Sequence, residues 1–261
     1  MPDFIHIAEQ LAREAGALLR EGYGTTLQIE FKSAIDLVTE YDRRSEALIL
    51  GGLRGSFPGH AVLGEESGRT HGDEYEWLVD PLDGTTNFAH GYPMFAVSLA
   101  LTHRGRLIAG VVYDPLRDEL FAAEAGAGAM LNGRPLRVST VTDLGRALLN
   151  TGFAYDVRTN PRNNLPEFTA FLMQAQAVRR GGSAALDCAY IGAGRADGYW
   201  EFGSKPWDLG AGVLVTREAG GRATTVTGDD DFLGQPSVVV SNGHIHAAML
   251  RVIHEASPST S

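Results

Sequence analysis

Residues 77–93 read WLVDPLDGTTNFAHGYP, and the rest of the chain is interpreted outward from this stretch. Its first three residues are apolar, as in a short buried strand that enters a core. Asp80 and Asp83 follow on either side of Pro81, which has no backbone N–H and is expected to end the strand. Gly84 comes next and can adopt backbone angles that other residues avoid. Two carboxylates, a bend and free amides suit divalent cations held beside a phosphate.

Each of these acids also has an ordinary interpretation. Asp-Pro and Asp-Gly pairs are common in turns, because an aspartate side chain bonds to its own backbone. Thr39 is a predicted N-cap for the next helix, so Asp42 in the first turn of that helix could serve only the helix dipole. Asp208, near the start of another predicted helix, could do the same. The residues by themselves leave local capping and a metal site both open.

Composition describes a globular protein of ordinary hydrophobicity with an acidic balance. The 261 residues carry a formal net charge of −10, which argues against a nucleic-acid partner, since such surfaces are usually basic. The single cysteine, Cys188, excludes an internal disulfide and lies among apolar neighbours, as a buried residue rather than a nucleophile would. Neither a signal peptide nor a run long enough to span a membrane is visible, so no membrane partner and a cytoplasmic location are expected.

Hydrophobic periodicity predicts a mixed α/β (α+β) fold. Helices are expected at residues 4–20, 40–53, 167–176, 184–193 and 206–218, with a last one ending near residue 255. Strands are expected at residues 25–31, 94–101, 107–113, 119–123, 144–152, 197–202, 222–226 and 237–241, and those between 94 and 123 form an antiparallel meander. We expect one compact unit with an N-terminal α+β half carrying the metal-binding loop (1–143) and a C-terminal α/β half (144–261).

Three further polar groups stand out. Glu65 and Glu66 follow an apolar strand, and on an extended chain only one of them could face a site. Ser183 is a natural N-cap for the helix after it, and the amides there could also meet an anion or a hydroxyl. Arg179 and Arg180 could contact a phosphate or an interface, and solvated surface is the preferred interpretation.

Four blocks of the sequence together resemble the inositol monophosphatase family of magnesium-dependent, lithium-sensitive phosphatases. They occur in the family's order and extend over nearly the whole chain: DLVTEYD at 36–42, GEES at 64–67, WLVDPLDGTTNFAHGYP at 77–93 and PWDLGAGVLVTREAGG at 206–221. The resemblance implies a layered α/β/α/β/α sandwich of the inositol monophosphatase and sugar phosphatase type, and a homodimer.

The resemblance also implies roles for individual residues. The metal ligands would be Glu65, Asp80, the backbone carbonyl of Leu82, Asp83 and Asp208. A catalytic set that activates and orients water would be Glu65, Thr85 and Asp42. Substrate would contact the phosphate-binding Gly84 and Thr85, the acids Asp83 and Asp208, and the ring-lining residues Gly182, Ser183, Ala184 and Glu201. Lys32 resembles, more loosely, a basic residue of a mobile loop near the site.

The predicted function is hydrolysis of a small-molecule phosphate monoester with two or three Mg²⁺ ions, which activate water and stabilise the leaving alkoxide. Residues 86–90, TNFAH, favour inositol 1-phosphate as substrate. The alternatives are a fructose-1,6-bisphosphatase or another sugar or nucleotide phosphatase of the same fold. A non-catalytic metal-binding regulatory protein is a third hypothesis. The chain has no G-x-S-x-G motif and no P-loop, so a covalent serine intermediate and a P-loop kinase are not expected.

Overall fold

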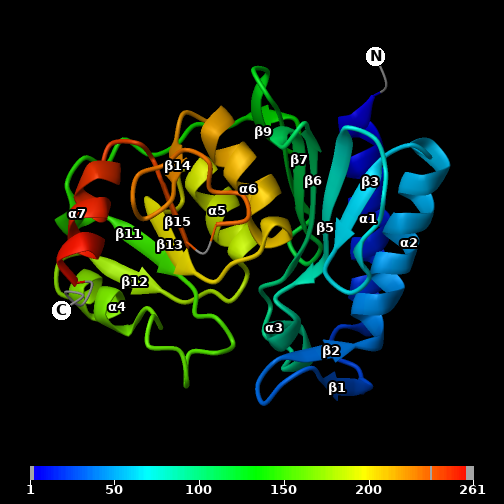
Figure 1. The fold of residues 1–261 in the computed structure, drawn as a ribbon, viewed down its shortest axis with the longest axis horizontal. Coiled ribbons are helices and arrows are strands. Elements are labelled where there is room, and N and C mark those ends of the chain that lie inside the picture. Colours follow the sequence, from blue (N-terminus) through cyan, green and yellow to red (C-terminus); the bar gives the residue numbers. More distant parts are fainter. Residues whose placement is uncertain (1–2, 236, 257–261) are drawn as a thin grey trace.

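The structure is a computed structural model that describes residues 3–235 and 237–256. Its layers alternate as the resemblance implied: a helical layer, a large sheet, a central helical layer, a smaller sheet and an outer helical layer (Figure 1). The structure thus confirms the layered α/β/α/β/α sandwich. Both sheets face the central helices, so the space between the sheets is where side chains from distant parts of the chain can meet.

The large sheet has eight strands and contains the antiparallel meander. Its strands run in the spatial order β10-β9-β8-β7-β6-β5-β3-β4, and β3 and β5 form its parallel pair. The strands are β3 Ala61–Gly64, β4 Gly68–Arg69, β5 Tyr75–Asp83, β6 Ala96–His103, β7 Arg106–Asp114, β8 Glu119–Glu124, β9 Gly128–Leu131 and β10 Arg134–Pro135. The predicted meander between residues 94 and 123 corresponds to β6, β7 and β8, paired in antiparallel register.

The smaller sheet has five strands in the order β12-β11-β13-β15-β14. They are β11 Leu148–Thr151, β12 Ala177–Arg179, β13 Gly198–Phe202, β14 Arg222–Thr224 and β15 Ser237–Ser241. The edge strand β12 was not predicted. A separate two-stranded sheet pairs β1 Ile29–Phe31 with β2 Leu37–Thr39, and the loop between these strands carries Lys32.

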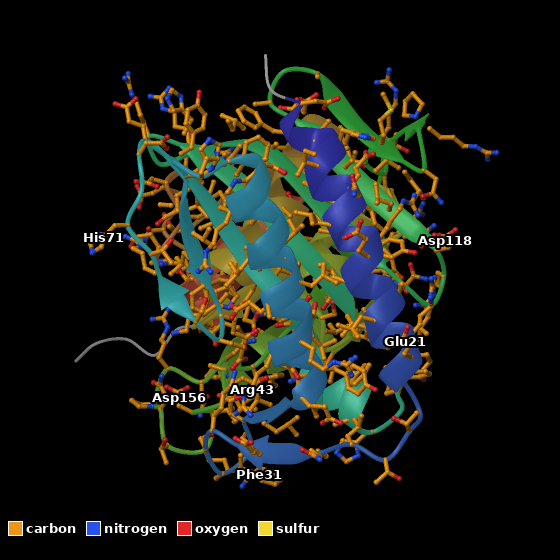
Figure 2. The ribbon with its side chains drawn as sticks, turned by 90° about the vertical axis from the view of Figure 1, so that its right-hand side faces the viewer. Glu21, Phe31, Arg43, His71, Asp118 and Asp156 are labelled. Atoms are coloured by element: carbon orange, nitrogen blue, oxygen red, sulfur yellow. The ribbon has the colours of Figure 1, made fainter. Side chains whose placement is uncertain are left out.

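The helices are α1 Phe4–Gly22, α2 Glu40–Ser56, α3 Thr85–Ala89, α4 Leu165–Leu172, α5 Ala184–Gly192, α6 Pro206–Glu218 and α7 His246–Ala256, with a 3₁₀ turn η1 at Leu144–Arg146. The helices α1 and α2 lie side by side across the outer face of the large sheet (Figure 2). The helices α5 and α6 fill the central layer, while α4 and α7 cover the smaller sheet. Asp3 caps α1 and Thr39 caps α2, as predicted.

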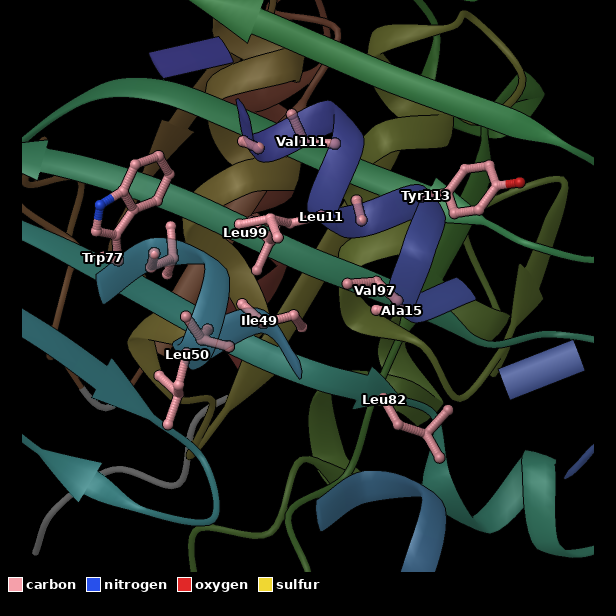
Figure 3. Packing of buried hydrophobic residues seen from close by; sticks show 14 of the residues in the cluster. Leu11, Ala15, Ile49, Leu50, Trp77, Leu82, Val97, Leu99, Val111 and Tyr113 are labelled. Atoms are coloured by element: carbon pink, nitrogen blue, oxygen red, sulfur yellow. The ribbon is translucent and has the colours of Figure 1, made fainter. Parts of the chain in front are cut away.

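The largest core cluster lies between α1, α2 and the large sheet (Figure 3). Trp77, Val79 and Leu82 of β5 are fully buried there, against Leu11 of α1 and Ile49 of α2. The apolar run at the start of the central stretch is therefore the buried strand that its composition predicted. It anchors the acids that follow it in a rigid element.

The prediction that β5 ends at Pro81 is wrong. The strand continues to Asp83, and its pairing with β6 shifts register between Asp80 and Asp83. A β-bulge at this point accommodates a residue without an N–H. The Pro81 carbonyl accepts a hydrogen bond from the Ser45 hydroxyl of α2 at 2.8 Å, which ties the bulge to the helical layer. The bulge turns the acidic end of β5 toward the space between the sheets.

Strands of both sheets end at the same end of the molecule. The β1–β2 hairpin and the loop that carries Asp156 both lie at that end (Figures 1 and 2). No helix in the described part of the chain has the length and apolarity needed to cross a membrane.

Candidate active site

A cavity of about 840 Å³ lies at the ends of both sheets and collects almost all of the predicted site residues. Its lining includes Glu65, Asp80, Leu82, Asp83, Gly84, Thr85, Gly182, Ser183, Ala184, Glu201 and Asp208. These positions come from β5, α3, α5, β13, α6 and the turn after β3. Asp42 is the exception, because it does not line the cavity and lies behind Thr85.

The end of β5 and the residues that follow it form one wall of the cavity. Asp80 Oδ1 accepts a hydrogen bond from the Leu82 amide at 3.0 Å, which folds the bulge. Gly84 has φ +99°, and a Cβ there would lie 3.0 Å from the Met94 carbonyl oxygen and 3.1 Å from that of Gly182. A side chain would be strained at this φ and crowded by backbone, so the predicted need for glycine is confirmed. The helix α3 starts directly after it, and its first two residues, Thr85 and Thr86, line the cavity.

The capping interpretation of Asp42 is confirmed, and its second carboxylate oxygen contacts Thr85. Its Oδ2 accepts hydrogen bonds from the Thr39 amide at 2.8 Å and the Thr39 hydroxyl at 2.6 Å, completing a capping box at the start of α2. Its Oδ1 accepts from the Thr85 hydroxyl at 2.9 Å. The carboxylate is fully buried, and burial raises its pKa although these hydrogen bonds lower it. The cap therefore holds a carboxylate against the hydroxyl that faces the cavity.

Asp83 connects the end of β5 to the start of α5. Its Oδ2 accepts from the Ser183 hydroxyl at 2.5 Å and the Ala185 amide at 2.8 Å, and its Oδ1 lies 3.3 Å from the Ala184 amide. Ser183 caps α5 as predicted, with its hydroxyl accepting from the Leu186 amide at 3.4 Å. Sequence reasoning missed this second role of Asp83, because its partners lie 100 residues further along the chain.

Glu65 and Glu66 lie in a turn at residues 65–67 rather than on an extended chain, so the geometric reason given for choosing between them is wrong. Both carboxylates form ion pairs with Lys32, at 3.3 Å from Nζ for Glu65 Oε1. Glu65 lines the cavity, as expected, and Glu66 is absent from its lining. Lys32 also lines the cavity, so the β1–β2 loop reaches the site.

The opposite wall is built by Glu201 and Asp208. Glu201 Oε2 accepts hydrogen bonds from the Tyr199 hydroxyl and, at 3.0 Å, from the Ser204 hydroxyl. A Cβ at Gly152 would lie 2.1 Å from Glu201 Oε1, so only a glycine lets this carboxylate occupy its place. Asp208 Oδ2 accepts from the Lys205 amide at 2.8 Å, which is the helix-capping role that the sequence left open.

The acids of the cavity repel one another. Burial, followed by the charges of Glu65, Asp83 and Asp208, raises the pKa of Asp80 well above its usual range. Burial likewise raises the pKa of Glu65 to about 7, and that of Asp83 to about 6 despite the hydrogen bonds it accepts. The pKa of Asp208 is raised well above its usual range for the same first cause. Lys32 offsets part of the charge of Glu65, whereas Asp80, Asp83 and Asp208 form no ion pair within the described residues.

The donor atoms of the cavity decide whether it suits a metal ion. In residues 3–235 and 237–256, no three histidine, cysteine, aspartate or glutamate side chains are grouped closely enough to form a metal cage by themselves. Mg²⁺ does not require such a cage, because one or two carboxylates usually hold it while water and substrate phosphate complete its octahedron. The donors here are carboxylate oxygens and the Leu82 carbonyl, next to mutually repelling charges. This donor chemistry fits a hard divalent cation.

The cavity also contains residues that sequence reasoning did not assign to it. Arg180 lines it, although it was interpreted as solvated surface, and so do Tyr155, Arg158 and Asp187. Asp187 Oδ1 is a fully buried oxygen with no hydrogen-bond partner in the described chain. Its acidity inside the apolar helix sequence ALDCAYIG was a signal that could have been used, since a charge in such a setting normally has a function or a partner.

The family model of the inositol monophosphatase family matches residues 2–257. The chain belongs to the inositol monophosphatase family. The inositol-1-monophosphatase of Synechocystis sp. is 44% identical over 253 residues, which cover 96% of this chain and 88% of that one. The Nus factor SuhB of Pseudomonas aeruginosa is 44% identical over 268 residues, covering 99% and 98% of the two chains.

Solved structures of the inositol monophosphatase family agree with the fold. The inositol monophosphatase from Anabaena (Nostoc) sp. superimposes with a TM-score of 0.89 at 44% identity, covering 98% of this chain and 97% of the other. The extragenic suppressor protein suhB from Bartonella henselae gives a TM-score of 0.91 at 39% identity, covering 96% and 98%. Membership of the family supports a phosphatase.

Proposed function

We propose that this protein is a Mg²⁺-dependent phosphatase that hydrolyses phosphate monoesters of polyols, with inositol 1-phosphate as the first candidate substrate. The observation that carries the proposal is the convergence of four acids, Glu65, Asp80, Asp83 and Asp208, on one cavity whose phosphate side is Gly84 and Thr85. Bound divalent cations would supply charge neutralisation, acidification of water and stabilisation of the leaving alkoxide.

The chain's own contribution to water activation would come from Thr85 and Asp42. The Thr85 hydroxyl has two acceptors within reach, Asp42 Oδ1 at 2.9 Å and the Leu82 carbonyl oxygen at 3.0 Å. When it donates to Asp42, its oxygen lone pairs are free to accept a proton from a water in the cavity. As that water attacks phosphorus, its proton would pass to Thr85 Oγ1 and the threonine proton to Asp42. Glu65, whose pKa of about 7 lies near the working pH of such enzymes, is the alternative base.

Binding of the substrate would use the two walls of the cavity. The backbone of Gly84 and the first amide of α3 would receive phosphate oxygens, since helix N-termini favour anions. The Glu201 carboxylate and the residues 182–184 would receive the ring hydroxyls. A nucleophilic cysteine has no place in this scheme, because Cys188 is fully buried and burial raises its pKa well above the usual range.

We also propose a cytoplasmic homodimer that is inhibited by lithium, divided near residue 143 into the halves expected from the sequence. Leu165, Leu172 and Met173 at α4 are exposed, with Met173 at 81%. Apolar side chains grouped on one surface helix are typical of an interface. Sedimentation equilibrium at twice the chain mass of 28.0 kDa would test the dimer.

A non-catalytic regulatory role is the second candidate function. Its support is that relatives with up to 44% identity bear the name Nus factor SuhB. Both candidates agree with the family match, so the phosphatase activity itself must be measured.

The decisive experiment is a phosphatase assay with and without Mg²⁺ on inositol 1-phosphate, fructose 1,6-bisphosphate, histidinol phosphate and a 3′-phosphonucleotide. We expect Mg²⁺-dependent turnover that is fastest on inositol 1-phosphate and inhibited by lithium. The control is Asp83→Asn, which removes a ligand charge while retaining one oxygen for the α5 amides. No turnover of any substrate by the folded wild type would favour the regulatory role, and near-normal turnover by Asp83→Asn would refute the assignment of Asp83.

A further inference from the structure

The guanidinium group of Arg180 lies over the wall that faces the proposed metal ligands. A Cβ at Gly182 would lie 2.8 Å from Arg180 Nη1, so the guanidinium covers the bare backbone of this glycine. Gly182 has φ +87° and directly precedes Ser183, which caps α5 and binds Asp83. Arg180 is thus exposed at the cavity, beside the segment 182–184 that is proposed to receive a substrate ring.

This arginine has hydrogen-bonding capacity that the described part of the chain does not use. Within residues 3–235 and 237–256, Arg180 forms neither a side-chain hydrogen bond nor an ion pair, whereas Arg179 donates to the Val178 carbonyl. Five N–H donors of a guanidinium normally find acceptors in a site. The charge of Arg180 acts on two acids of the cavity, Asp187 and Glu201, and it contacts neither of them directly.

The Asp187 side chain has a hydrogen-bond acceptor without a partner among the described residues, next to the segment that carries Arg180. It lies in the first turn of α5, is 2% exposed, and its Oδ1 has no hydrogen-bond partner in the described chain. A Cβ at Gly181 would lie 2.8 Å from this oxygen, so it lies directly beneath the segment that carries Arg180. A buried acid whose oxygen lacks a partner is costly, and burial raises the pKa of Asp187 well above its usual range. Its place beneath the segment that carries Arg180 is the geometric link between the two residues.

We propose that Arg180 is a specificity-determining residue that hydrogen-bonds the hydroxyl oxygens of a polyol at the end remote from the phosphate. Asp187 would be a positioning residue that acts on Arg180 through the Gly181 segment and through its charge, without contacting the guanidinium. The inference rests on the proposed phosphatase function and deepens it. A hydroxyl both accepts and donates, so it can accept from Arg180 while it donates to the nearby Glu201. A second phosphate would suit the cation but would be repelled by the two carboxylates, so the neutral hydroxyl is favoured.

The test compares two substrates in the wild-type and variant proteins with Mg²⁺. Inositol 1-phosphate presents hydroxyls to this wall, and p-nitrophenyl phosphate presents none. The measured quantity is the ratio of their kcat/KM values. Arg180→Gln should lower this ratio about 10-fold or more, chiefly by raising KM for inositol 1-phosphate, because hydrogen bonds from a charged donor are lost. The matched control Arg179→Gln, next along the chain and outside the cavity lining, should leave the ratio unchanged.

Asp187 is tested through a double-mutant cycle. Asp187→Asn alone should lower the same ratio, and should lower it no further in the Arg180→Gln background, because its effect passes through Arg180. Additive losses would show that Asp187 acts only on the fold. An unchanged ratio in Arg180→Gln, or a loss confined to fructose 1,6-bisphosphate, would overturn the proposal. If the wild type hydrolyses neither substrate, the phosphatase function itself fails, and this outcome is distinct from a failure of the Arg180 assignment.

Discussion

Single residues in this protein combine a local structural contact with a contact at the cavity. Asp42 uses one carboxylate oxygen to complete the N-cap of α2 and the other to receive the Thr85 hydroxyl. Asp83 faces the cavity and also satisfies the first amides of α5. Rigid placement of this kind is what an active site needs, because a catalytic group that is held by its neighbours loses little freedom on reaction.

The Thr85 hydroxyl gives the sharpest residue-scale prediction. Thr85→Ala should lower kcat about 100-fold or more, because the proton path from water to Asp42 is interrupted. Thr85→Ser retains the hydroxyl and should stay within a few-fold of the wild type. Steady-state rates with Mg²⁺ measure both effects, and thermal unfolding checks that both variants are folded. A Thr85→Ala enzyme with wild-type kcat would leave Glu65 as the base and remove Thr85 from the mechanism.

The central helices α5 and α6 set the distance between the two sheets, and small residues set the distance between these helices. A Cβ at Gly212 of α6 would lie 2.7 Å from the Ala185 carbonyl oxygen and 2.7 Å from Cys188 Cβ. A Cβ at Gly210 would lie 3.0 Å from Ala100 Cβ of the large sheet. Because α5 carries Ser183 at its start and α6 carries Asp208, this spacing also fixes the two walls of the cavity.

Replacing Gly212 should therefore damage the fold and the site together. Gly212→Ala is expected to lower the free energy of unfolding by about 1–3 kcal/mol, as overpacking of a tight interior does. The matched control is Gly51→Ala in α2, where nothing beyond the helix's own backbone and the two neighbouring residues lies within 4 Å of the added Cβ. The better helix propensity of alanine should stabilise the protein by about 0.5–1 kcal/mol. Urea unfolding measures the free energy of unfolding of both variants. A Gly212→Ala protein as stable as the wild type, or as stable as Gly51→Ala, would contradict the role given to Gly212.

At the scale of the whole molecule, the repelling acids couple stability to pH and to cations. Glu65 and Asp83 have raised pKa values in the folded protein, about 7 and about 6. Their contribution to stability is thus full at pH values below their ordinary pKa and is lost as pH rises through about 7. His246 has the opposite effect on the pH dependence of stability, because burial lowers its pKa to about 4. Its contribution to the free energy of unfolding is therefore lost as pH falls toward that value.

The expected outcome is a pH-dependent gain in Tm on addition of Mg²⁺. Binding requires ionised carboxylates, so the gain should be larger at about pH 8 than at about pH 5.5. In EDTA, Asp80→Asn should raise Tm relative to the wild type, and more at pH 8, because one repelling charge is removed while His246 and all other groups are unchanged. Differential scanning fluorimetry gives these values. A gain in Tm that is equal at both pH values would contradict a site made of these acids.

The features that the sequence predicted correctly depend on residues close together in the chain. Thr39 and Ser183 cap the helices that follow them, Gly84 adopts a positive φ, and the helix at residues 206–218 has the predicted bounds. A cap, a backbone angle and an amphipathic period are each decided within a few residues, so a single sequence contains them. The convergence of the acids on one cavity was implied by the resemblance to a family rather than by local pattern.

Tertiary structure decided what depends on distant partners. Pro81 lies within a strand because the pairing with β6 shifts register around it and the Ser45 hydroxyl donates a hydrogen bond to its carbonyl. Both partners are distant in the chain, so local propensity could not predict them. Arg180 lies at the cavity because Gly182 has no side chain to exclude it. Asp83 accepts a hydrogen bond from the Ala185 amide at the start of α5, and no sequence pattern around residue 83 predicts this contact. Hydrogen bonding and packing between segments about 100 residues apart are properties of the folded chain, since only folding brings those segments within reach.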